Sequence, residues 1–179
     1  MRLEELLAQK KTAIIDKWFD VVADTYPADT AGFIKRQKDP FSNPVGGTTQ
    51  KGLTVIMDEL LGEMNHDKID SFLDPIIRIR AVQDFTPSRA ISFVFSLKKI
   101  IRNQLNKSDF NDHRIVAELF EFDLKIDLIG LIAFDIYMKC REKIYQIKAN
   151  EEKNRTFSAF ERAGLIKELP GSGPELVKL

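Results

Sequence analysis

The sequence predicts an all-α fold, a bundle of about six to seven helices that ends in one long helix. Two observations carry this prediction. Apolar residues recur at steps of three and four along nearly the whole chain of 179 residues, and this spacing lines one side of an α-helix. No pair of alternating apolar runs is joined by an Asn-Gly or Asp-Gly turn, so no part of the chain indicates a β-hairpin.

The first part of the chain is expected to hold two helices that are separated by a proline. The first covers about residues 3–25 and ends because Tyr26 precedes Pro27, since the residue before a proline avoids the helical region. A short helix over about residues 28–38 follows. The segment 39–44 contains two prolines and interrupts the helical pattern.

Two further helices are expected in the middle of the chain. One begins between Asn43 and Thr49 and stops at Gly62, because glycine commonly ends helices. The other covers about residues 67–81. Pro75 is expected to bend or split it, because proline removes a backbone donor and clashes with the preceding turn.

The clearest helix start is Thr86 followed by Pro87, a hydroxyl cap and then proline at the first helical position. This helix is expected to run to about Leu105. The longest helix begins at about Asp112 and keeps one apolar side to about Lys148. The residues on that side are Ile115, Leu119, Phe122, Ile126, Ile129, Ala133, Ile136, Cys140, Ile144 and Ile147.

The length of the last helix divides the chain into two predicted parts. At a rise of about 1.5 Å per residue, the run with an apolar side extends roughly 50 Å, more than a compact domain of this size needs. Residues 149–155 are almost wholly polar, which is typical of a helix that no longer packs on its own core. We therefore expect a helical domain over residues 1–148, and a polar helical extension with a flexible tail over residues 149–179.

The composition limits the classes of partner. Lysine plus arginine and aspartate plus glutamate both number 27, so no net field attracts nucleic acid or an anionic membrane. The single cysteine, Cys140, excludes a disulfide within the chain. No run approaches about eighteen apolar residues, and the first turns carry acids where a signal peptide is apolar. We expect a cytoplasmic protein without membrane insertion.

No arrangement of residues predicts catalysis, a metal site or a cofactor. His66 lies three residues after Glu63, the spacing of di-iron bundle proteins, but the chain has no second copy of that motif. His113 is the only other histidine. Asp123 and Asp127 stand four apart on the long helix, and we interpret them as a solvated acidic ridge rather than a catalytic pair.

Two polar segments invite a binding interpretation. Gly46 and Gly47 resemble a phosphate loop, but lysine precedes the later glycine and no strand comes before, so a tight helix start is favoured. Arg80 and Gln83 lie in an otherwise apolar region. Their side chains either satisfy loop carbonyls or, together with Trp18, line a pocket for a small molecule or a partner.

Two segments also resemble a known family, the N-terminal domain of RsbT co-antagonist proteins of the RsbR and RsbD type. They are residues 41–46 and residues 78–90, which are followed by Phe93 and Leu97-Lys98. Trp18 and the Tyr26-Pro27 helix end are similar to that family as well. The resemblance spans roughly residues 10–148.

This resemblance implies a globin-like helical sensor domain, commonly dimeric and without haem. Such domains precede a STAS output domain in stressosome-type bacterial signalling. A STAS domain needs on the order of a hundred residues, and nothing comparable follows the long helix here. The chain therefore resembles a sensor domain standing alone, whose output must be received by another chain.

Our leading hypothesis is a non-enzymatic regulatory module in stress-response signalling that acts through a homodimer or an unidentified regulatory protein. The expected interface includes Ile144 and Ile147, together with Phe157 and Phe160 beyond the polar stretch. The alternative is a globin-like sensor or carrier without haem, which binds a small ligand near Trp18, Arg80 and Gln83. An enzyme has no positive support beyond the acidic ridge.

Overall fold

The computed structural model describes residues 2–39, 41–83 and 85–165, and within them it confirms the all-α fold class. These residues form seven α-helices and one short 3-10 helix, and no strand occurs among them. The elements are α1 (Leu3–Gln9), α2 (Lys11–Ala23), α3 (Ala28–Arg36), α4 (Pro44–Leu61), α5 (His66–Val82), α6 (Pro87–Arg102), η1 (Asp109–Asn111) and α7 (His113–Arg162). The chain divides into two compact units, Met1–Arg141 and Glu142–Leu179.

Two helix starts share the same capping chemistry, which was predicted for Thr86-Pro87 but not for Asn43-Pro44. Asn43 caps α4, where its side chain accepts a hydrogen bond from the Gly46 N–H and Pro44 takes the first helical position. Thr86 caps α6 in the same way, and Pro87 follows it. In both cases a side-chain oxygen satisfies a backbone donor that the first turn leaves unpaired.

The predicted extent of the first helix is wrong. The helix expected over residues 3–25 is two helices, because the backbone tightens at Lys10, whose N–H bonds to the Leu7 carbonyl. This break carries the Lys10 ammonium to the carbonyl of Gln104. Pro75 does not split α5, which continues through it. The last helix continues past Lys148 to Arg162, into the stretch where a polar helical extension is expected.

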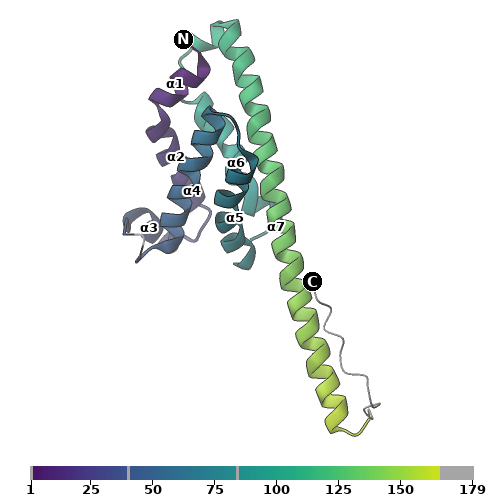
Figure 1. Ribbon diagram of the computed structural model, residues 1–179. Coiled ribbons are helices and arrows are strands. Elements are labelled where there is room, and N and C mark those ends of the chain that lie inside the picture. Colours follow the sequence, from purple (N-terminus) through teal and green to yellow (C-terminus); the bar gives the residue numbers. More distant parts are fainter. Residues whose placement is uncertain (1, 40, 84, 166–179) are drawn as a thin grey trace. The chain divides into compact units, whose positions relative to one another are not determined.

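The core of the first unit is built around α2 and α4. In Figure 1, α2 lies against α4 and α6, and α4 lies against α5. Gly52 lets α4 and α5 approach closely, because a Cβ at this position would stand 2.7 Å from Cδ1 of Ile76 and 2.9 Å from the Phe72 carbonyl oxygen. Trp18 of α2 is completely buried and donates its indole N–H to the Phe93 carbonyl at 2.8 Å.

The segment of α7 within the first unit buries the predicted apolar side. The buried residues are Ile115, Leu119, Phe122, Ile126, Ile129, Ala133, Ile136 and Cys140. Ion pairs between α6 and α7 hold this segment in place, as do hydrogen bonds such as the one from the Leu3 N–H to Glu118 at 2.7 Å.

The second unit is described over residues 142–165, where α7 continues to Arg162. None of these residues is buried. The predicted flexible tail around Pro170 lies outside the described residues. In the part of the chain that the structure describes, no helix combines the length and apolar character needed to cross a membrane.

Candidate functional site

The first segment shared with the resembling family is a structural clamp between α3 and α4. The Asn43 side chain, only 3% exposed, donates to the carbonyls of Ile34 at 2.9 Å and Gln37 at 2.8 Å. Its oxygen accepts from the Gly46 N–H at 2.9 Å. A Cβ on Gly46 would lie 2.2 Å from the Asn43 amide nitrogen, so glycine is required there. The tight helix start expected at this position is confirmed.

The second shared segment is organised by Arg80, whose side chain is completely buried. Its Nε donates to the Ala90 carbonyl at 2.9 Å, and its Nη2 donates to the Arg89 carbonyl at 3.0 Å and to Oγ1 of Thr25 at 2.9 Å. One guanidinium therefore ties the end of α5 to the first turn of α6 and to the residues that follow α2.

Three aromatic rings surround the same guanidinium. Its central carbon lies 4.6 Å from the ring centre of Phe85, 5.3 Å from that of Phe93 and 5.6 Å from that of Tyr26. Burial lowers the pKa of Arg80, and Tyr26 partly opposes this change. Burial raises the pKa of the Tyr26 phenol, against the nearby positive charge. The charge thus gains cation–π contacts in place of bulk water.

The predicted pocket residues do not all meet. Trp18 and Arg80 come together around Phe93, with the Trp18 and Phe93 ring centres 6.3 Å apart. Gln83 caps the end of α5 and is exposed. The hydrogen bonds of Arg80 correspond to the interpretation in which its side chain satisfies loop carbonyls. A ligand pocket formed by these three residues stays a prediction.

The acidic ridge predicted on α7 is not a free solvated face. Asp123 accepts two hydrogen bonds from the guanidinium of Arg102, and Asp127 accepts one from the Lys98 ammonium at 2.6 Å. Both bases belong to α6. The two aspartates therefore form interhelical ion pairs, a role that sequence spacing alone could not reveal because the partners lie 21 and 29 residues away.

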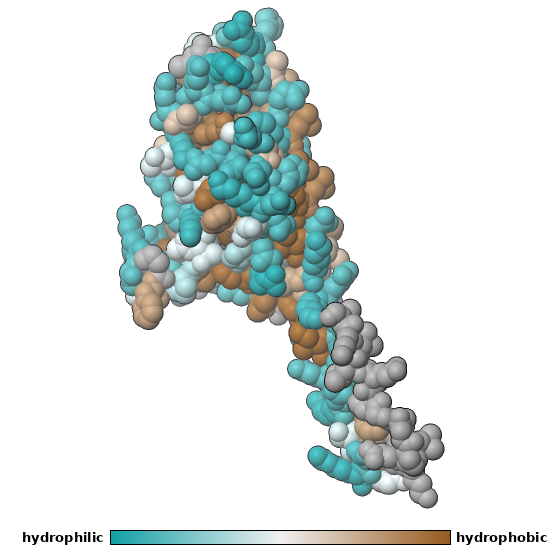
Figure 2. All heavy atoms as spheres, viewed as in Figure 1, coloured by the Kyte–Doolittle hydropathy of each residue, from teal (hydrophilic) through white to brown (hydrophobic). Residues whose placement is uncertain are grey.

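The main unassigned surface of the first unit is a second apolar side of α7, which we call the outer face. Its members recur at steps of three and four, and their exposed fractions range from 36% to 64%. Figure 2 shows hydrophobic residues along the edge of the first unit formed by α7. The outer face consists of Phe120, Leu124, Leu128, Leu131, Phe134 and Met138.

Phe95 of α6 adjoins the outer face. Its ring covers Gly130 of α7, where an added Cβ would stand 2.3 Å from Cζ of Phe95. The phenylalanine remains 39% exposed despite this contact. Glycine at position 130 thus lets an aromatic ring lie directly on the helix backbone beside the outer face.

The outer face was not predicted from the sequence, because only one apolar side was assigned to the long helix. The signal was present, since the stretch from Leu128 to Met138 carries apolar residues at most positions. A helix that is apolar on more than one side either lies deep in a core or packs against a second surface. Here one side is buried and the other is exposed.

The predicted interface residues all lie in the second unit. Ile147, Phe157 and Phe160 are 45–48% exposed, and Ile144 is half-buried. Ile144 and Ile147 are three residues apart, as are Phe157 and Phe160, so the members of each pair are neighbours on the helix surface. Among the described residues of this unit, no second helix covers either pair.

The histidines offer no constellation for chemistry. His66 and His113 are the first residues of α5 and α7, and both are exposed. Within the described ranges, no three histidine, cysteine, aspartate or glutamate side chains gather so that they could hold a metal ion.

Comparison with known proteins identifies one family. The family model of the RsbT co-antagonist protein rsbRD N-terminal domain matches residues 12–151. An uncharacterized protein of Archaeoglobus fulgidus is 25% identical over 143 residues, which cover 78% of this chain and 83% of that protein. No solved structure matches the chain.

Proposed function

Because the chain belongs to the RsbT co-antagonist protein rsbRD N-terminal domain family, we propose that it is a non-enzymatic regulatory module that signals through contacts between protein chains. In this proposal it forms a homodimer in the cytoplasm and passes a stress signal to a separate regulatory protein. The family supports a regulatory role, and the outer face of α7 supports the mode of action.

The outer face is the observation that carries this proposal. Six large apolar side chains on one side of a helix form a continuous strip, and monomeric proteins seldom leave such strips uncovered. Residues 120 to 138 extend about 27 Å along the helix at the usual rise. This length suits a helix-to-helix contact, in which residues at steps of three and four meet a matching surface.

A second copy of the chain supplies a matching apolar surface. Fully burying one such side chain is worth about 1.5–3 kcal/mol, so half-exposed ones contribute roughly 1 kcal/mol each. A symmetric dimer buries the face twice, which amounts to on the order of 12 kcal/mol. The entropic cost of association is about 4–15 kcal/mol. The free energy of burial in a homodimer is therefore comparable to the entropic cost of association. One copy that faces a polar surface buries the outer face once and gains only about half of that free energy.

The second unit gives the module a further contact. Ile144, Ile147, Phe157 and Phe160 are exposed or half-buried apolar residues on the same continuous helix. We assign them to the interface with the regulatory partner, because they are too few and too widely spaced to form a coiled-coil seam on their own.

The test of the dimer is Leu131→Asp, placed at a position that is 64% exposed on the outer face. Light scattering coupled to size-exclusion chromatography should show a dimer for the unchanged chain and a monomer for the variant, since a carboxylate cannot be buried unpaired. Val82→Asp is the matched control, because Val82 is 62% exposed but lies on α5. A monomeric unchanged chain, or a variant that still dimerises, would refute the proposal.

A further inference from the structure

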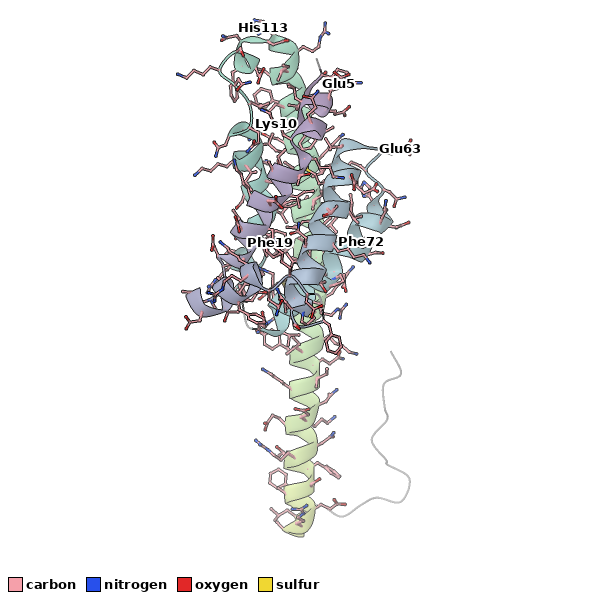
Figure 3. All side chains as sticks on the ribbon, turned by 90° about the vertical axis from the view of Figure 1, so that its left-hand side faces the viewer. Glu5, Lys10, Phe19, Glu63, Phe72 and His113 are labelled. Atoms are coloured by element: carbon pink, nitrogen blue, oxygen red, sulfur yellow. The ribbon has the colours of Figure 1, made fainter. Side chains whose placement is uncertain are left out.

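A hollow of about 470 Å³ opens between α2, α3 and α4. Trp18, Arg80 and Gln83 do not line it. Its wall on α2 carries Asp16, Phe19 and Asp20, and its wall on α3 carries Lys35. Lys38 follows the end of α3 and also lines the hollow. Phe19 is labelled in Figure 3. The volume lies within the range of about 300–1,000 Å³ that is usual for small-molecule sites.

The charges in the hollow are opposite on its two walls. Asp16 and Asp20 are four residues apart on α2 and therefore share a side of that helix. Lys35 pairs with Asp20 at 3.4 Å and with Asp24 at 2.7 Å, so the α2 and α3 walls are already linked by ion pairs.

Asp16 and Lys38 carry the charges that remain available. Neither of them forms a salt bridge or a side-chain hydrogen bond with any residue that the structure describes. The hollow thus presents one uncommitted carboxylate and one uncommitted ammonium group, together with the side-chain amide of Gln50.

The remaining lining is apolar or already satisfied. Phe19 is half-buried and Ile34 is buried, so the hollow also has an apolar surface. Asn43 uses both of its side-chain N–H groups in the clamp between α3 and α4, so it has no donor left for a ligand. Polar recognition therefore depends on the charges of Asp16 and Lys38 and on the side-chain amides of Gln37 and Gln50.

We propose that this hollow binds an α-amino acid with an apolar side chain. The ammonium group of the ligand meets Asp16, its carboxylate meets Lys38, and its side chain packs on Phe19. A simple anion would meet the uncommitted carboxylate of Asp16, and a simple amine would meet the uncommitted ammonium group of Lys38, so each would be repelled by one wall. Only a zwitterion gains from both walls. The inference goes beyond the proposed function, because it supplies an input that the homodimer does not require.

Calorimetry with three matched compounds tests the ligand class. L-Leucine should bind, whereas 4-methylpentanoate, which lacks the amine, and 3-methylbutylamine, which lacks the carboxylate, should each bind about tenfold more weakly, because each loses one charge contact. L-Phenylalanine tests the larger apolar side chain. The proposal fails if neither amino acid binds at about 10 mM, or if either truncated analogue binds as tightly as L-leucine.

Two variants test the location. Asp16→Asn and Lys38→Met should each weaken L-leucine binding about tenfold. Both residues are exposed, so the fold should survive. The matched controls Asp29→Asn and Lys17→Met change exposed residues on α3 and α2 outside the lining, and should leave the affinity unchanged. Unchanged affinity in both hollow variants would refute the site.

The oligomeric state of the same samples separates this inference from the proposed function. Asp16→Asn and Lys38→Met should elute as the unchanged chain does, because neither residue belongs to the outer face of α7. Loss of amino-acid binding with an intact dimer would therefore leave the proposed function standing. Binding to a monomeric chain would uphold the hollow and refute the dimer.

Discussion

The two segments of α7 differ in how they use apolar residues. From residue 113 to residue 141, the helix buries one side in the first unit and exposes an apolar outer face on another. From residue 142 to residue 162, no side chain is buried, and the few apolar residues are spaced among charges. The first segment has enough apolar surface for a core and an interface, whereas the second has enough only for a local contact.

This difference separates stability from assembly. A residue on the buried side of the first segment contributes to folding, because unfolding exposes it to water. A residue on the outer face contributes only when another chain covers it. A residue in the second segment contributes to neither the core nor the proposed dimer. Substitutions placed in these three positions should therefore have effects of decreasing size.

The largest effect is expected from Ile126→Ala. Ile126 is completely buried in the first unit, and removing its side chain from a packed core should cost about 2–5 kcal/mol of unfolding free energy. Leu124→Ala, two residues earlier on the outer face, is the matched control at 61% exposure. In urea denaturation at low protein concentration it should cost less than about 0.5 kcal/mol. Similar losses of unfolding free energy in the two variants would show that the buried side and the outer face of α7 contribute equally to folding, contrary to this prediction.

A smaller effect is expected from the ion pairs that fasten the first segment. Asp123→Asn removes the charge that Arg102 contacts through both Nη atoms, and should cost about 1 kcal/mol because the carboxylate is largely buried. Glu152→Gln in the second segment breaks only an exposed pair with Arg155, and should change stability by less than about 0.3 kcal/mol.

Measurements at high salt concentration test whether the Asp123–Arg102 ion pair is shielded from solvent. The cost of Asp123→Asn should persist at about 1 M NaCl, because screening acts mainly on exposed charges. If that cost disappeared in salt, the contact between Asp123 and Arg102 would be a surface pair, and it would not anchor α7 within the first unit.

Local chemistry made several features predictable. Thr86-Pro87 identified the start of α6, because capping depends on residues within one turn, whereas the start of α4 was placed only within residues 43–49. The buried side of α7 was predictable over residues 115–140, because a core imposes a helical period. The break at Lys10 was not, since no glycine or proline marks it.

The contacts that organise the second family segment could not be predicted. Arg80 bonds to Thr25, which is 55 residues away, and its ring contacts come from three separate elements or loops. The sequence marked Arg80 as unusual, but only the fold shows which carbonyls it reaches. The outer face was visible in composition, yet its exposure depends on which side α6 covers.

Little effect on folding is expected from the double change Phe157→Ser and Phe160→Ser. Both residues are nearly half-exposed in the second unit, and no described residue there is buried. Unfolding free energy should therefore change by less than about 0.5 kcal/mol. The homodimer should persist as well, because the outer face is untouched.

The informative readout for this double variant is capture of another protein by the purified dimer. Retained dimerisation with lost capture would assign the second segment of α7 to the regulatory partner. Lys153→Ser is the matched control, because Lys153 is exposed on the same segment without contributing apolar surface. If instead the double variant became monomeric, dimerisation would depend on the second segment, and the division of labour between the two segments of α7 would be wrong.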